Sequence, residues 1–238
     1  MSGPHRIRYR FDLPDGSFRT LDFAFDAIDF RLSTPGPVEP PFWTELKYNQ
    51  CANCPLDARE HAHCPAALQM TSTLEPLKAL VSFDTVGVTV TQAERTVYAE
   101  TSAQQAMSSV LGLIMATAGC PWTDHLRPMA RFHLPFASEA ETVYRSICMY
   151  LLALEITGAD EKGFAALQEL YENLHVVNRD MSRRLGAATR SDPARNAIAL
   201  LDSYTTLLPA ALERSFEELR PLFGAWQGER KKSPFNLP

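Results

Sequence analysis

The spacing of apolar residues changes along the chain from a strand period to a helix period. Apolar and charged residues alternate from Ile7 to Leu13, which is the pattern of a strand with one buried face. From Ser102 onward the apolar residues recur mainly at helical spacing. A chain that places its strands first and its helices later folds as an α+β protein, so we expect N-terminal antiparallel β-hairpins and a predominantly helical C-terminal half.

Turn residues divide the first hundred residues into strands. Pro14-Asp15-Gly16 predicts a tight turn, because proline presets φ and glycine accepts a positive φ, and the flanking strands would then form a hairpin that ends near Phe25. A second hairpin is expected from Val86–Val90 and Thr96–Thr101. Two further strands are expected at 27–32 and 42–49.

Capping residues and prolines set the expected helices. Ser102 with Gln105 and Ser138 with Glu141 have the spacing of capping boxes, and Gly119 is placed to end the first of these two helices. The expected helices are 65–83 with a break at Pro76, 102–118, 138–156, 161–185 and 192–219, and a loop is expected at 121–136. We expect one α+β domain over 1–227, β-rich over 1–101 with a cysteine loop at 50–65 and helical over 102–227, followed by a flexible tail at 228–238.

Composition excludes several classes of protein. The 238 residues are 45% hydrophobic and 21% charged, so the chain can bury a core, and its net charge of −5 does not suit binding to nucleic acid by bulk charge. No apolar run approaches the ~20 residues of a membrane span, and the N-terminus lacks the apolar core of a secretion signal. With an odd number of cysteines, five, these features predict a cytoplasmic protein with reduced thiols.

Three of the five cysteines fall within fourteen residues. Cys51, Cys54 and Cys64 lie in a non-periodic segment, and Cys54 and Cys64 are each followed by proline, which holds a sulfur in a loop or at the first turn of a helix. A Cys-x-x-Cys loop can turn both sulfurs toward one metal ion or cluster. The spacing therefore predicts a metal site, with a redox-active dithiol or inert thiols as the alternatives.

Three thiols leave a four-coordinate centre one ligand short. Cys120, in Gly119-Cys120-Pro121, is the expected fourth ligand, and His61 and His63 are the alternatives. Cys120 could also be an open, reactive position next to the metal. Four thiolates suit a [4Fe–4S] cluster or zinc, and we expect the cluster because the ligands come from widely separated positions and Cys-Pro ends the ferredoxin ligand run.

The remaining chemically interesting residues have simpler interpretations. Cys148 lies in an apolar helical context and is expected to pack in the core. Arg127, Arg131 and His133 follow Cys120 closely and could bind an anionic group of a cofactor, or the arginines could tie a loop to the fold. The basic stripe Arg179, Arg183 and Arg184 is expected to be a solvated helix face.

The cysteine segments resemble those of an uncharacterised family of bacterial proteins. The resemblance rests on 51–56 (Cys-Ala-Asn-Cys-Pro-Leu), 63–67 (His-Cys-Pro-Ala-Ala), Gly119-Cys120-Pro121, 126–135 and 196–202. It implies a bacterial, cytoplasmic protein and brings no activity with it.

We therefore expect a metal-binding protein that holds a cysteine-ligated iron–sulfur cluster and acts as a redox or oxygen-responsive sensor or electron carrier, with a protein partner. One alternative is an adaptor that binds another protein and is stabilised by a structural zinc ion. A second is an enzyme that uses the arginines and histidine beside the metal. The common nucleotide-binding and hydrolase motifs are absent from the sequence.

Overall fold

The computed structural model describes residues 4–33, 39–158, 165–188, 196–199, 201–202 and 219–224. Over these residues it has an N-terminal antiparallel sheet followed by a helical C-terminal half, as the periodicity predicted.

The four strands form one antiparallel sheet in the order β2-β1-β3-β4 within the described residues. They span His5–Asp12 (β1), Phe18–Phe25 (β2), Thr85–Thr91 (β3) and Thr96–Ser102 (β4). Both expected hairpins are present, and Gly16 in the first turn adopts a φ of 80°, which glycine accepts without strain. β1 and β3, far apart in the sequence, pair at the centre of the sheet.

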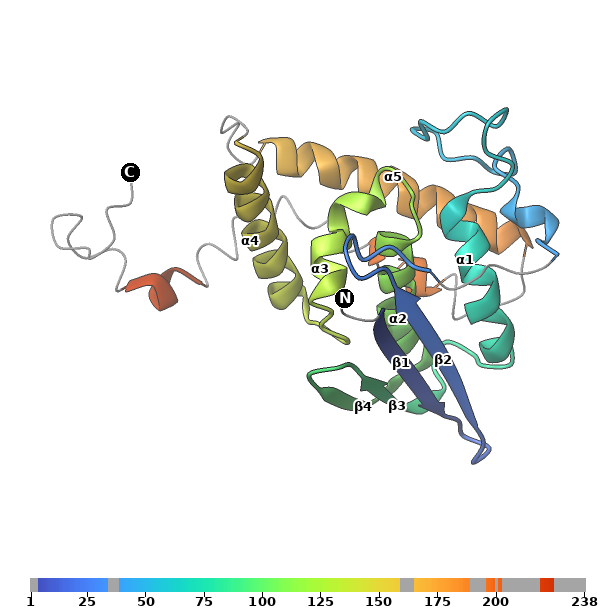
Figure 1. Cartoon of the computed structure of the whole chain (residues 1–238). Helices are drawn as coiled ribbons and strands as arrows, with labels where there is room; N and C mark the ends of the chain where they lie inside the picture. Colours follow the sequence, from blue (N-terminus) through green and yellow to red (C-terminus); the bar gives the residue numbers. More distant parts are fainter. Residues whose placement is uncertain are drawn as a thin grey trace, which may run out of the picture.

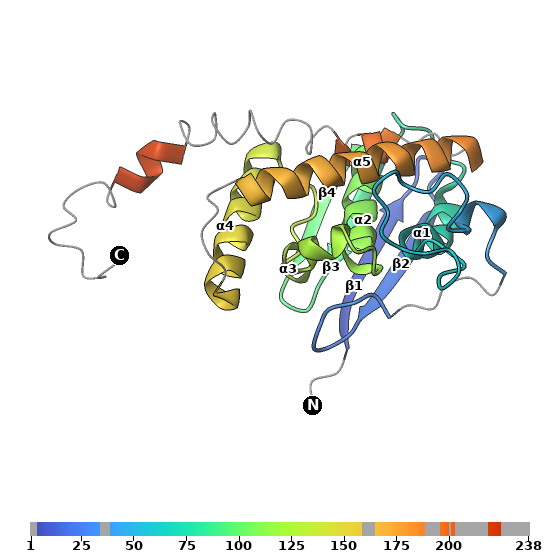
Figure 2. The same ribbon diagram turned by 90° about the horizontal axis from the view of Figure 1, so that it is seen from above.

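One face of the sheet is buried and the other is exposed. Ile7, Tyr9 and Phe11 of β1 and the alternate valines of β3 are buried, whereas the arginines between the β1 residues are exposed. The buried face packs under α2 (Ala103–Thr117), with α1 (Pro65–Leu74) beside it (Figures 1 and 2). This layer of sheet and helices is the main core of the described chain.

Two longer helices complete the described fold. α4 spans Glu139–Thr157 and begins at the expected capping box of Ser138 and Glu141. α5 spans Ala165–Ala188 and runs across the molecule from the end of α4 to the side of α1 (Figures 1 and 2). α2 begins at Ser102, whose hydroxyl accepts a hydrogen bond from the Gln105 N–H, and ends before Gly119 at a φ of 89°.

Two expected strands are wrong. Residues 27–32 form a turn that is held by Asp26, whose carboxylate accepts from the backbone N–H groups of Ile28 and Asp29, and only a single bridge joins Phe25 to Leu32. Residues 42–49 form a short 3-10 helix, η1 (Phe42–Thr44), followed by turns. Apolar residues in short connections produced a strand-like pattern without a neighbouring strand to pair with.

The helix boundaries also differ from expectation in two places. α1 ends at Leu74 and passes into a 3-10 turn, η2 (Glu75–Leu77), so the helix stops near Pro76 and does not reach residue 83. The expected loop at 121–136 contains η3 (Thr123–Leu126) and α3 (Arg127–Arg131). Short helices of this kind carry too few turns to show a period.

The expected helix over 192–219 lies largely outside the described residues, of which 196–199 and 201–202 are helical, and the tail at 228–238 lies wholly outside them. The last described element is η4 (Arg220–Phe223). Within the described ranges, no helix combines the length and the apolar character that crossing a membrane requires.

Candidate metal centre

The Cys51–Cys54 loop is a tight turn that is fastened to α5. The N–H of Cys54 donates to the carbonyl of Cys51 at 3.0 Å, which closes the turn. The N–H of Ala52 donates to the Asp180 carboxylate at 2.8 Å, and the Asn53 side-chain amide donates to the side-chain oxygen of Asn173 at 2.9 Å. Both partners lie on α5, so the loop has a fixed position against this helix.

Cys64 lies at the start of α1 and is 8% exposed. Its N–H donates to the carbonyl of Thr44 at 2.8 Å, and Pro65 occupies the first helical position, where its missing N–H costs no hydrogen bond. The Cys-Pro pair therefore starts a helix and places the sulfur at its N-terminal end, which is one of the two positions that the sequence predicted.

Cys120 follows the C-terminal end of α2 and lies beside the Cys51–Cys54 loop. The indole N–H of Trp122, two residues after Cys120, donates to the carbonyl of Asn53 at 2.7 Å. Thr123 donates its hydroxyl to the carbonyl of Met115, which fastens the same segment to the end of α2. The segment after α2 is thus joined to the first cysteine loop although Cys120 lies 66 positions after Cys54 in the sequence.

The other three thiols lie close enough to Cys51 to affect its titration. Burial, together with the smaller effects of the neighbouring Cys64, Cys120, Asp180 and Cys54 in that order, raises the pKa of the Cys51 thiol to about 12. We call Cys51, Cys54, Cys64 and Cys120 the cysteine cluster. Cys64 is part of the main core, and Cys54 and Cys120 pack against that core. All five cysteines of the chain are free thiols.

A buried arginine lies beside the cysteine cluster. Arg184 of α5 is 1% exposed, and it donates to the carbonyls of Trp43 and Glu45 at 2.7 Å and of Leu46 at 3.2 Å. Its charge lowers the pKa of the Cys64 thiol, against the larger opposite effect of burial. In the described part of the chain no carboxylate forms an ion pair with Arg184, and its Nε has no hydrogen-bond partner.

The prediction of a solvated arginine stripe is thus wrong for Arg184, which points into the core. Arg179 and Arg183 are exposed and contact the buried carboxylate of Asp180 at 3.2 and 3.5 Å. These two exposed arginines offset the charge of Asp180. Arg184 has no such carboxylate among the described residues; its guanidinium contacts three backbone carbonyls and lies 5.9 Å from the centre of the Tyr48 ring.

The donor set fits a thiolate-bound centre in chemical type and in charge. A cluster or zinc ion with four thiolates carries net negative charge, and a buried guanidinium without a carboxylate partner would stabilise it. Within the described ranges, however, no three His, Cys, Asp or Glu side chains form a group that could hold a metal ion as they stand. Binding would therefore require rotation of the cysteine side chains toward a common centre.

The two alternative histidine ligands are differently placed. His63 has its Nδ1 2.9 Å from the Thr44 hydroxyl, and His61 is exposed. Neither histidine is among the groups that affect the titration of Cys51 or Cys64.

The three predicted cofactor-binding residues have partners of their own. Arg127 contacts the carboxylates of Asp29 at 3.3 Å and Asp124 at 3.7 Å, and so ties its segment to the turn after β2. The Arg131 guanidinium lies 5.6 Å from the centre of the Phe30 ring. The structure therefore places both arginines in contacts that fasten a surface segment, which was the alternative interpretation.

His133 is buried beneath the sheet, away from that surface. Its Nε2 lies 2.5 Å from the Tyr9 hydroxyl, which also lies 2.8 Å from the Ser109 hydroxyl. Burial, with a smaller effect of Arg145, lowers the pKa of His133 to about 3, so the ring is neutral at pH 7. Burial also raises the pKa of Tyr9, which keeps its proton.

The prediction that Cys148 packs in the core is wrong, since Cys148 is exposed. α4 buries Val143, Ser146 and Ile147, and Cys148 lies outside that face. The surrounding apolar residues suggested burial, but several of them, including Leu152 and Ile156, are themselves exposed.

Sequence reasoning missed Asp180, Arg184, Asn53 and Trp122, which position the cysteine cluster. Asp180 and Arg184 are one helical turn apart on α5, and an acidic–basic pair at that spacing is usually an exposed pair. The apolar residues Val177, Met181 and Leu185 of the same helix are buried, and the helical period places Arg184 next to them. The place of Arg184 on the apolar face of α5 was therefore the sequence signal that could have predicted its burial.

A family model described as a domain of unknown function, DUF6901, matches residues 7–224. No curated protein and no solved structure matches the chain.

Proposed function

Because the chain belongs to the DUF6901 family, a family of unknown function, we propose its function from its own residues: it binds a [4Fe–4S] cluster through Cys51, Cys54, Cys64 and Cys120. The observation that carries the proposal is the meeting of three separate segments of the chain at the cysteine cluster. The Trp122–Asn53 hydrogen bond fastens the Cys-x-x-Cys turn to the segment after α2. The Cys-Pro helix start brings Cys64 close enough to affect the titration of Cys51. Four of the five cysteines therefore lie in one region, within or against the main core.

The charge balance around the cysteine cluster also supports an anionic occupant. Burying the guanidinium of Arg184 costs free energy unless an opposite charge lies nearby. Thiolates bound to a metal centre would supply that charge beside Cys64. Without the metal, the raised pKa of Cys51 and Cys64 keeps these thiols protonated, so metal binding would release protons.

A bound iron–sulfur cluster supplies one-electron redox chemistry and sensitivity to oxygen. We propose that the protein is a redox or oxygen-responsive sensor or electron carrier in the cytoplasm, where thiols stay reduced, and that it passes its signal or electron to a protein partner. The chain's own residues would bind the cluster and keep water from its buried side, since Cys64 belongs to the apolar core. The half-buried Cys51, Cys54 and Cys120 leave the other side accessible to a partner or to oxygen.

The experiment is isolation of the whole protein without oxygen, followed by visible and electron paramagnetic resonance spectra before and after dithionite and after exposure to air. We expect a brown protein that bleaches on reduction and loses its colour in air. A colourless protein that contains one zinc ion per chain would show that the site holds a structural zinc ion and not a cluster. A colourless protein without metal under these conditions would contradict both.

A further inference from the structure

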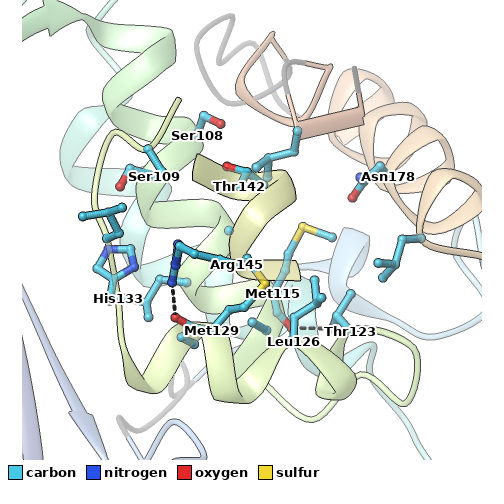
Figure 3. A pocket seen from close by; sticks show the side chains of 18 of the residues that line it. Ser108, Ser109, Met115, Thr123, Leu126, Met129, His133, Thr142, Arg145 and Asn178 are labelled. Atoms are coloured by element: carbon cyan, nitrogen blue, oxygen red, sulfur yellow. Dashed lines mark hydrogen bonds between the residues drawn. The ribbon is translucent and has the colours of Figure 1, made fainter. Parts of the chain in front are cut away.

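A second site lies on the other side of the segment that follows α2. A partly open cavity of about 180 Å³ lies between α2, α3, α4 and α5 (Figure 3). Most of its lining is apolar, with Leu113, Ala116, Leu126, Met129 and Leu174 among the residues. A dry cavity of ~150 Å³ accepts a benzene molecule, so this one has room for a six-membered ring or a short alkyl chain.

One cation lines the cavity, within the described residues. The guanidinium of Arg145, on α4, donates through Nη2 to the carbonyl of Met129 at 2.7 Å (Figure 3). The same Nη2 donates to the carbonyl of Phe132 at 2.9 Å. None of the ion pairs in the described part of the chain includes Arg145, and no Asp or Glu there lines the cavity. The carboxylate of Glu141 raises the pKa of Arg145, but this carboxylate accepts a hydrogen bond from the N–H of Ser138 at 2.8 Å in the capping box. Arg145 is thus a half-buried cation whose carboxylate partner is missing among the residues described.

Two buried polar side chains also face the cavity. Asn178 of α5 is 5% exposed and Ser108 of α2 is 2% exposed, and both line the cavity (Figure 3). Neither side chain forms a hydrogen bond to any residue that the structure describes, and neither is among the fully buried unpaired groups of those residues, so both polar groups are open to the cavity that they line. His133, which also lines the cavity, is committed to Tyr9. The cavity therefore combines an apolar interior with a cation and two neutral hydrogen-bonding groups.

We propose that this cavity binds a small apolar monocarboxylate, a molecule with one carboxylate on a ring or short chain. Its carboxylate pairs with Arg145, its apolar body fills the space between Leu113, Met129 and Leu174, and the Asn178 amide hydrogen-bonds a polar atom of the ligand. The site is separate from the cysteine cluster and does not depend on a metal. It assigns to the chain a small-molecule binding activity beyond the proposed redox function.

The test is isothermal titration calorimetry of the full chain with benzoate and hexanoate, and with benzamide as the neutral isostere of benzoate. The wild type should bind at least one of the two acids. Where benzoate binds, it should bind about tenfold or more tightly than benzamide, because the neutral amide cannot form a charged hydrogen bond with Arg145. Arg145→Met should remove the preference for the acid. Arg95→Met, at an exposed arginine in the β3–β4 turn, is the matched control and should bind as the wild type does.

Ala116→Leu adds a larger side chain to the cavity wall and should abolish binding of every probe, while its thermal unfolding and its metal content show that the fold and the cysteine cluster are intact. If Arg145→Met does not fold, two measurements still test the proposal. One is the comparison of benzoate with benzamide on the wild type, and the other is the binding of the acids by Ala116→Leu. Absence of binding by both acids, equal binding of benzoate and benzamide, or unchanged acid binding in Arg145→Met or Ala116→Leu would overturn the proposal. Iron and zinc content, measured on the same samples, reports separately on the proposed metal centre.

Discussion

Acid should destabilise this protein through one buried histidine. His133 is neutral in the folded protein down to a pH near its pKa of about 3, whereas in the unfolded chain it accepts a proton near its ordinary value of 6.5. Between these two values the unfolded chain binds one more proton than the folded chain. The free energy of unfolding therefore falls as the pH falls through this interval, and the loss is absent above about pH 6.5.

The size of the effect follows from the difference between the pH of the measurement and the pKa of His133 in the unfolded chain. At about pH 5, some 1.5 units below the ordinary value, the expected loss is about 2 kcal/mol relative to pH 7.5, at ~1.4 kcal/mol per unit. The assay is urea unfolding at the two pH values, of the wild type and of His133→Gln, which removes the titrating ring. The variant should be less stable at both pH values because the contact with Tyr9 changes.

The decisive quantity is the difference between the two pH values. The wild type should lose about 2 kcal/mol more than His133→Gln on going to pH 5, because all other titrating groups are common to both. Equal losses would refute the reasoning and would mean that His133 accepts a proton in the folded state at an ordinary pH.

Two further substitutions test the packing around the cysteine cluster, and a third tests the exposure of Cys148. Arg184→Met should lower the free energy of unfolding by about 3 kcal/mol, measured by urea unfolding, because it leaves the buried carbonyls of Trp43 and Leu46 without their donor; a stability change under 1 kcal/mol would contradict this. Trp122→Phe should cost about 1 kcal/mol for its hydrogen bond, and should reduce the metal retained after dialysis if the two cysteine loops share a centre. Cys148→Ser should change the free energy of unfolding, measured by urea unfolding, by no more than a surface substitution does, about 0.5 kcal/mol, because Cys148 is exposed.

The sheet and the main helices could be predicted from local signals. Alternation over Ile7–Leu13, the Pro14-Asp15-Gly16 turn and the capping residues Ser102 and Ser138 act within a few residues, and a single sequence displays them completely. The strands predicted at 27–32 and 42–49 were wrong because a strand also depends on residues far away in the sequence. A strand needs a partner, and whether one is available is decided by the fold rather than by the segment itself.

The sequence predicted the cysteines of the candidate site but not the residues that position them. The cysteine spacing and the Gly119-Cys120-Pro121 context indicated which thiols to consider, and the structure places all four in one region. The residues that hold them there act from α5, more than a hundred positions away from the first loop. Burial of Arg184 and exposure of Cys148 depend on which face of each helix meets the core, and short patterns in a single sequence did not resolve this.

The most direct test of the metal centre is the iron, sulfide and zinc content of the anaerobically isolated wild type and of five single Cys→Ser variants. We predict about four iron and four sulfide per chain in the wild type and in Cys148→Ser, the matched control. Cys51→Ser, Cys54→Ser, Cys64→Ser and Cys120→Ser should each lose most of the metal. Full metal content in Cys120→Ser with loss in the other three would remove Cys120 from the centre, and full content in all four variants would contradict the account.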